Sequence, residues 1–200
     1  MRTNIRDLRR RELIEATRDV IAECGFENAT IAKISGKAGF SIGYLHHHFS
    51  GKDELLGETI RVLYGDMRVY LAQALPGVVD PVDRFLIVLN ANFRPEQFTP
   101  ENAFAWISFL ARVPFNEEFV RLQTMIEKRL FSNLMFDIGR LLPKDQARAV
   151  AEEIATLIDG YWVRLAVSPG SIDSEQALER IWAVADRLLD GKVRSHPKPR

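Results

Sequence analysis

Apolar residues recur every three or four positions along most of the chain, which is the spacing of one buried helix face. The first such run predicts a helix over about 6–24, and Gly25 follows it as a C-terminal stop. No stretch alternates between apolar and polar residues as a strand does. The pattern therefore predicts an all-α fold with about nine helices.

Two short helices are predicted after this first one. Thr30 is an N-cap for the first of them, and Ser41 is an N-cap for the second, which ends near Phe49. Gly39 lies between them and permits a tight turn. Two short helices around a glycine turn, after a longer helix, are typical of a helix-turn-helix, whose second helix lies in the DNA major groove.

The rest of the chain predicts longer helices with recognisable starts. Ser50 and Asp53 have the capping-box spacing before a helix that runs to about Leu75. Five more helices are expected, near 81–93, near 100–112, between Pro114 and Pro143, over 144–167 and over 174–191. Of these, the first and the last have capping residues in Asp80 with Pro81 and in Asp173 with Gln176.

These elements divide into an N-terminal and a C-terminal domain. Residues 1–52 are the predicted three-helix DNA-binding domain, and residues 53–192 are the predicted ligand-binding and dimerisation domain. Residues 193–200, which end in "SHPKPR", have little that packs and are expected to form a mobile tail.

Composition narrows the functional classes. Lys+Arg and Asp+Glu are each 27, so any contact with a polyanion is local. The first eleven residues carry five Arg against one Asp, a net charge of +4, and form a candidate basic arm. The single cysteine, Cys24, excludes an intramolecular disulfide, and its apolar neighbours predict a buried thiol in a reducing cytoplasm. The longest nearly apolar run, "AFAWISFLA", is far shorter than the ~20 residues of a membrane span, so a soluble protein with no membrane partner is expected.

Three consecutive histidines, His46, His47 and His48, lie in the second short helix. Consecutive helical residues advance ~100° each, so these rings fan out and cannot share one metal ion as an i, i+4 pair does. We therefore expect no metal and no cofactor. If Leu45 and Phe49 face the core, the side of the helix that carries His46 and His47 faces outward.

At these residues the chain resembles the tetracycline-repressor (TetR) family. The stretch "TIAKISGKAGFSIGYLHHHFSGKDELL" is similar to its signature, with a threonine opening the second helix, "AG-hydrophobic-S-x-G" at the turn and "HF-x-x-K-x-x-L" leading into helix four. His46 stands where the family often has a phosphate-contacting tyrosine. The resemblance implies a repressor that binds pseudo-palindromic double-stranded DNA as a homodimer. It further implies phosphate contacts from Thr30, Ser41, His46 and Lys52, and a surface facing the bases formed by Ile42, Gly43, Tyr44 and His47.

The second half resembles the choline-responsive repressors of glycine-betaine synthesis within that family. The similar stretches are "AWISFLA", "RLQTMIEKRLFSNL" and "LIDGYWVR". A quaternary ammonium is held best against aromatic faces with a carboxylate nearby. The resemblance and this chemistry together imply a choline-like effector site, with candidate lining residues Trp106, Phe109, Asp159, Tyr161 and Trp162. An aromatic at helical spacing also suits a plain core.

The last two predicted helices carry apolar rows that favour an antiparallel hairpin. Their members are Ile154, Leu157, Ile158 and Leu165, and then Ala177, Ile181, Val184, Ala185 and Leu188. A second copy packed on this hairpin makes a two-fold four-helix interface. The leading hypothesis is therefore a ligand-responsive transcriptional repressor and not an enzyme. Three alternatives stay open: a repressor with an unrelated apolar or aromatic ligand, an enzyme that uses the histidines, and a helical adaptor that binds only protein.

Overall fold

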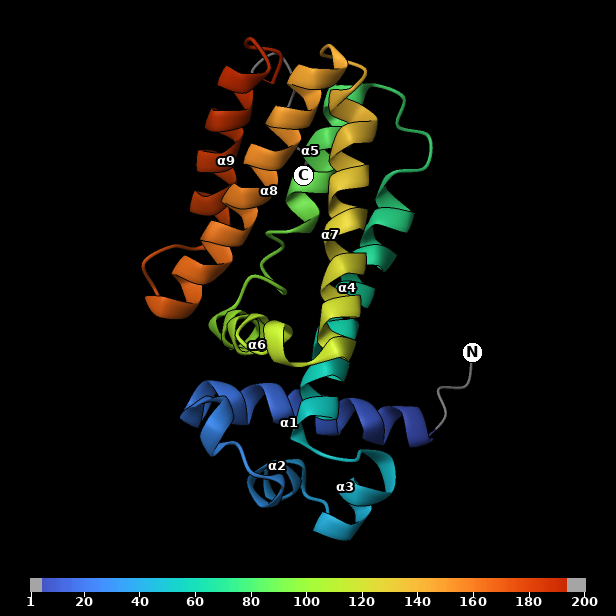
Figure 1. Ribbon diagram of the computed structural model, residues 1–200, viewed down its shortest axis with the longest axis vertical. Helices are drawn as coiled ribbons and strands as arrows, with labels where there is room; N and C mark the ends of the chain where they lie inside the picture. The colour runs from blue at the N-terminus through green and yellow to red at the C-terminus, as the bar shows by residue number, and fades with distance from the viewer. Residues whose placement is uncertain (1–4, 194–200) are drawn as a thin grey trace. The chain divides into compact units, whose positions relative to one another are not determined.

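The computed structural model describes residues 5–193 (Figure 1), and in this part it contains only helices. The α-helices are α1 (Ile5–Asn28), α2 (Ile31–Ala38), α3 (Ile42–His48), α4 (Lys52–Ala74), α5 (Pro81–Ala91), α6 (Pro100–Leu110), α7 (Glu117–Ile138), α8 (Lys144–Val167) and α9 (Ser174–Leu188), with a 3₁₀ helix at Val113–Phe115. The predicted all-α fold is confirmed.

The chain forms two compact units. One consists of the residues up to Tyr64 together with Pro100–Val120, and the other consists of Gly65–Thr99 together with the residues from Arg121 onward. The first unit thus contains α6 beside the three N-terminal helices, and both α4 and α7 contribute to both units. A boundary at residue 52 between two functional domains stays a prediction.

In the first unit, α1 lies between α6 on one side and α2 and α3 on the other (Figure 1). Its interior contains fully buried apolar side chains from each of the N-terminal helices, such as Leu13, Ile34 and Leu45. The regular part of α1 ends where the sequence predicts, because Gly25 has a φ of 75°, a left-handed conformation that glycine adopts without strain. This packing gives α2 and α3 a fixed support.

In the second unit, α8 and α9 lie side by side and run in opposite directions (Figure 1), so the predicted hairpin is present. Ile181 is fully buried within the chain, as are Ile154, Ala177 and Ala185. Sequence periodicity identified these residues as apolar but could not show which neighbour covers them. Because the chain's own core covers them, they are not available as the contact surface for a second copy.

A buried ion pair joins α5 to α7 in the second unit. Arg84 Nε donates to Asp137 Oδ1 at 3.0 Å, and the Asp137 side chain is almost fully buried. Burial raises the pKa of Asp137, and the hydrogen bond and the charge of Arg84 oppose this shift. Removing Arg84 leaves a buried carboxylate without its cation, which is costly.

The start of α4 corrects one prediction. The proposed capping box joined Ser50 to Asp53, but Glu54 is the carboxylate that accepts from the backbone N–H of Ser50 at 2.7 Å and from its hydroxyl at 2.8 Å. These bonds lower the pKa of Glu54. The helix begins at Lys52, one residue later than the capping box requires, so Glu54 is its third residue and faces back toward Ser50.

Two further expectations concern the C-terminal tail and membrane-spanning helices. The predicted tail begins at Val193, which is buried, and its remaining residues 194–200 lie outside the described residues. No helix within residues 5–193 is long and apolar enough to cross a membrane.

Candidate functional site

The two short helices begin and turn as the sequence predicts. The Thr30 hydroxyl accepts from the backbone N–H of Lys33 at 3.3 Å, and the Ser41 hydroxyl accepts from that of Tyr44 at 3.1 Å. Gly39 ends α2 with a φ of 73°. Both hydroxyls therefore satisfy helix N-termini, and both side chains lie at the exposed starts of these helices.

The outer face of α3 is free of packing against the rest of its unit. Leu45 is fully buried on the inner face, whereas Ile42 is 49% exposed and His46 and His47 are exposed. A Cβ added at Gly43 would meet no atom within 4 Å. The fold therefore gives no steric reason for a glycine at this position, and the expected close approach of Gly43 to DNA bases stays a prediction.

Tyr44 takes part in an aromatic cluster that the sequence did not reveal. Its ring stacks on Phe40 at 4.8 Å and lies 4.7 Å from the His48 ring, and the Arg9 guanidinium lies 5.8 Å from its centroid. Burial and the positive charges around His48 lower the pKa of its imidazole, which favours the neutral form. Tyr44 is half-buried, so this cluster fixes its ring, and its contact with bases stays a prediction.

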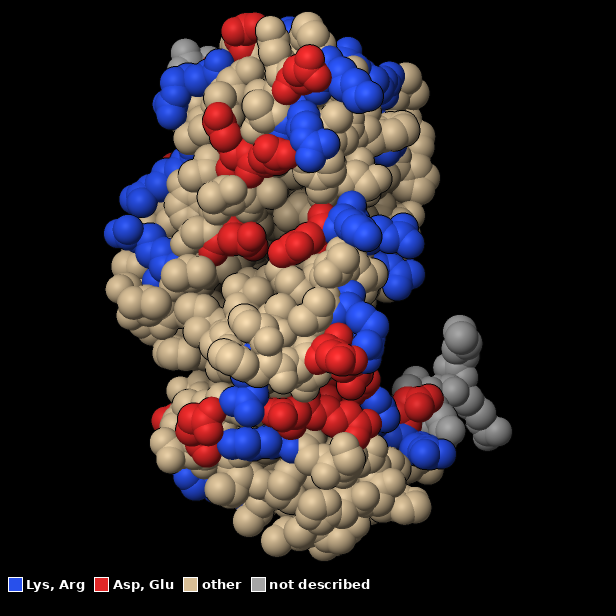
Figure 2. All heavy atoms as spheres, viewed as in Figure 1, with Lys and Arg blue, Asp and Glu red and all other residues tan. Residues whose placement is uncertain are grey.

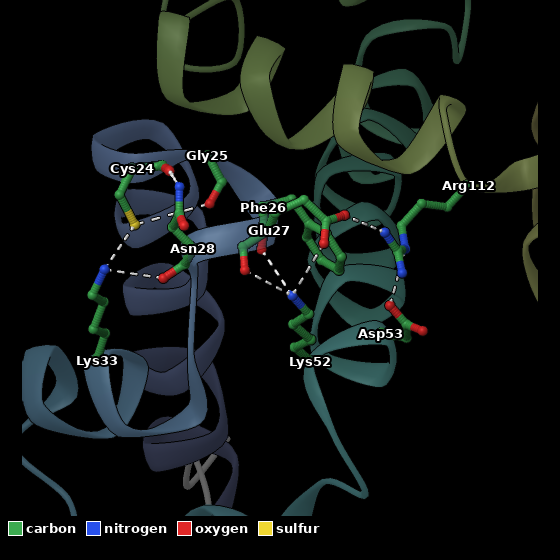
Figure 3. Close-up of polar contacts among 9 residues, drawn as sticks. All are labelled: Cys24, Gly25, Phe26, Glu27, Asn28, Lys33, Lys52, Asp53 and Arg112. Carbon is green, nitrogen blue, oxygen red and sulfur yellow. Dashed lines mark hydrogen bonds and ion pairs between the residues drawn. The ribbon is translucent and has the colours of Figure 1, made fainter.

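Lys52, the first residue of α4, places its side chain beside the C-terminal end of α1 (Figure 3). Its ammonium donates to the carbonyls of Phe26 and Glu27 at 3.1 and 3.2 Å, and it lies 4.5 Å from the Phe26 ring centroid. Arg112 lies 4.3 Å from the same ring and pairs with Glu27 and Asp53 at 2.9 and 3.1 Å. The ammonium thus stabilises carbonyls at a helix end, and the expected phosphate contact stays a prediction.

Charge is distributed unevenly over this unit. On the face in Figure 2, basic and acidic side chains gather over α1, whereas the end formed by α2 and α3 is mostly uncharged. Within the candidate basic arm, Arg10 pairs with Glu58 at 2.6 Å and Arg2 lies outside the described residues. Hydroxyl groups and imidazole rings are therefore prominent among the groups that α2 and α3 present.

The candidate effector residues fall in both units. Phe109 is fully buried in the first unit, where its ring lies 5.6 Å from Trp106 and 4.9 Å from Phe119. Trp106 is half-buried. Asp159, Tyr161 and Trp162 belong to α8 in the second unit. That all five residues line one effector site stays a prediction.

In the second unit, four aromatic rings form a connected chain that includes two of these residues. Tyr161 contacts Phe93 at 5.8 Å, Phe93 contacts Phe98 at 5.2 Å, and Phe98 contacts Trp162 at 5.3 Å between centroids. The Trp162 indole N–H donates to the carbonyl of Asn92 at 3.2 Å, which fixes the ring orientation. Phe98 was missed because it lies in an irregular segment where periodicity gives no signal, and Phe93 was not singled out because it fell at the end of the helix predicted over 81–93, which ends at Ala91.

Asp159 is a largely buried acid that lies near another negative charge. Burial and the neighbouring charge of Glu127 raise the pKa of Asp159 to about 6. Glu127 on α7 accepts from the Gln123 amide at 2.8 Å. Among the ion pairs within residues 5–193, none involves Asp159. Its contact with the expected effector stays a prediction. No cluster of three or more His, Cys, Asp or Glu side chains in the same part of the chain is arranged to hold a metal ion.

Comparison with known protein families shows which family the chain belongs to. The model of bacterial regulatory proteins of the tetR family matches residues 13–59, and that of the BetI-type transcriptional repressor C-terminal domain matches residues 81–190. The chain belongs to the TetR family, in its BetI-type branch. It is a DNA-binding transcriptional repressor. The regulator called BetI from Agrobacterium fabrum is 37% identical to this BetI-type chain, covering 95% of it and 90% of the relative.

Other similar proteins are also transcriptional regulators. The BetI regulator of Rhizobium meliloti is 34% identical, over 96% of each chain. A putative transcriptional regulator from Pseudomonas aeruginosa has a TM-score of 0.74 and 26% identity, covering 98% and 97% of the two chains. A putative regulator from Saccharomonospora viridis, solved in complex with choline, has the same fold with a TM-score of 0.74 at 18% identity, covering 88% and 95%. These relatives are transcriptional regulators, which is a non-enzymatic role.

Proposed function

We propose that this BetI-type repressor acts in the cytoplasm as a homodimer on a pseudo-palindromic operator and that choline or a related quaternary ammonium compound is its effector. The names of its relatives and the choline complex of a fold neighbour support this proposal. The observation that carries it is Asp159, a largely buried carboxylate next to the negative charge of Glu127, on the helix that also carries Trp162.

A cation near Asp159 satisfies two requirements at once. It supplies the positive charge that the Asp159–Glu127 pair lacks, and its methyl groups can pack on an aromatic face without needing hydrogen bonds. Trp162 lies three residues beyond Asp159, so the two side chains project from neighbouring positions on α8. A neutral ligand of the same shape gains only the apolar contact.

The dimer is proposed to use the outer face of α8 and α9. The exposed side of α8 has Thr156, Gly160, Val163 and Val167 at spacings of four, three and four, and the last two are 40% and 72% exposed. Exposed valines that recur on one helix face suit an isologous contact with a second α8. Effector binding then favours a dimer geometry in which the two α3 helices no longer match major grooves ~34 Å apart.

A ligand screen tests the effector class. We expect choline to raise the melting temperature, because a ligand at one hundred times its dissociation constant adds about 2.7 kcal/mol to the free energy of unfolding. The carbon isostere 3,3-dimethylbutan-1-ol is the matched control and should give a much smaller shift. Equal shifts would instead favour a repressor with an apolar ligand.

A further inference from the structure

A hollow of about 450 Å³ lies within the second unit between the end of α4, the segment after α5 and the start of α9. Three aromatic residues contribute to its lining, namely Tyr70, Phe93 and Trp182. The Ser174 hydroxyl at the start of α9 donates to the carbonyl of Phe93, which holds the two walls together. Small-molecule sites have volumes of roughly this size and combine aromatic walls with a few polar groups.

One aromatic wall already holds a cation. The Arg94 guanidinium lies 4.7 Å from the Tyr70 ring centroid, and Arg94 pairs with Glu96 at 3.2 Å. The Glu96 side chain is 66% exposed, so this ion pair holds Arg94 weakly. The Tyr70 face is therefore oriented to bind positive charge.

The charge of the lining favours a cation. Glu96, Glu175 and Glu179 contribute three negative charges and Arg94 contributes one positive charge, a net of −2. Glu175 and Glu179 are four residues apart on α9, on one face of the helix. This potential repels an anion and adds nothing for a neutral molecule.

One polar residue of the lining, Asn90, has an unsatisfied side-chain oxygen. The Asn90 Oδ1 atom is buried and has no hydrogen-bond partner within the described residues. A buried acceptor without a donor is unfavourable.

We propose that this hollow is a second site for organic cations, which takes an ammonium with an apolar body in place of the Arg94 side chain on Tyr70. The site does not include Asp159 and does not depend on the effector proposal. Its wall residue Phe93 contacts Tyr161 and, through Phe98, Trp162. The chain of rings therefore connects this hollow with aromatic residues of the same helix as Asp159.

The test uses the full-length protein with the substitution Asp159→Asn, which removes the other candidate carboxylate. Benzyltrimethylammonium is titrated into this parent and into four further variants by calorimetry. Tyr70→Leu should weaken binding about tenfold by removing the cation–π contact, and Glu175→Gln should weaken it about threefold. Arg94→Met should strengthen binding about threefold, because the resident cation is gone. Glu153→Gln, on the exposed side of α8 and away from the hollow, is the matched control and should change nothing.

The gain from Arg94→Met separates a binding site from a merely structural cluster. If Arg94 only stabilises its loop, its removal weakens binding as Tyr70→Leu does, and the proposal is overturned. Absence of binding to the Asp159→Asn parent at millimolar probe overturns it as well. The effector proposal is judged separately, by the dependence of choline binding on Asp159 in the otherwise unchanged protein.

Discussion

Replacing Asp159 with asparagine should stabilise the ligand-free protein at neutral pH. The pKa of Asp159 is about 6 in the folded chain against an ordinary value of 3.8, a difference of about 2 units. Each unit corresponds to 1.36 kcal/mol, so the ceiling is about 3 kcal/mol. The side chain retains some solvent contact, which reduces the expected gain in the free energy of unfolding to about 1–2 kcal/mol.

The pH dependence follows from the sign of this shift. The folded chain binds a proton at Asp159 more tightly than the unfolded chain does, because burial and Glu127 both penalise the charged form. The stabilising effect of protonation is fully present below about pH 4 and is lost as the pH rises through about 6. The Asp159→Asn variant has no such loss, so the two free energies of unfolding should converge near pH 4 and separate up to about pH 6.

Urea denaturation of both proteins between pH 4 and 8, at one fixed protomer concentration, measures this difference. Glu127→Gln is the matched control, since it removes the like charge and should bring the pKa of Asp159 closer to its ordinary value. In the unchanged protein, choline affinity should fall below about pH 6 because a proton and the cation compete for the carboxylate. An Asp159→Asn protein that is less stable than the unchanged protein at every pH would contradict this prediction, since Asp159 would then have a favourable partner in the folded chain.

Three further predictions concern DNA binding and assembly. Gly43→Ala should add about 1 kcal/mol of helix stability yet weaken operator binding in a gel-shift assay, whereas Gly65→Ala in α4 should leave operator affinity unchanged; equal affinities would exclude a close approach at Gly43. Lys52→Ala should lower the free energy of unfolding and reduce the salt slope of DNA binding by about one unit, and an unchanged slope would leave only the role at the end of α1. Val163→Glu should yield folded monomers in sedimentation, whereas Ile181→Glu should unfold the chain; a fully dimeric Val163→Glu protein would place the interface elsewhere.

The sequence predicted the helix starts well because caps are local. Thr30, Ser41, Asp80 and Asp173 each bond a backbone N–H two or three residues ahead, and such a spacing can be recognised without knowing the fold. It was harder to predict from the sequence which neighbour covers a given apolar residue. Ile181 fits a dimer row as well as an intrachain core, and only the position of α8 settles which one it joins.

The sequence identified candidate site residues by their chemical type but did not show which residues they contact. Lys52 donates to the carbonyl of Phe26, 26 positions away, and Asp159 takes its raised pKa partly from Glu127 on another helix. Neither neighbour is visible from local spacing, because each depends on how distant helices pack. The segment after α5 supplies two of the four connected rings, yet the predicted helix over 81–93 ran into it and included Phe93, while Phe98 lay where periodicity gives no signal.

The most direct test of an effector-responsive repressor is one equilibrium measurement. Fluorescence anisotropy follows the binding of the full-length protein to a pseudo-palindromic fragment selected from random DNA, at constant salt, with and without choline. The account predicts that the dimer binds this fragment, that choline weakens binding by roughly five- to 150-fold, and that 3,3-dimethylbutan-1-ol does so far less. An operator affinity that saturating choline leaves unchanged would contradict it.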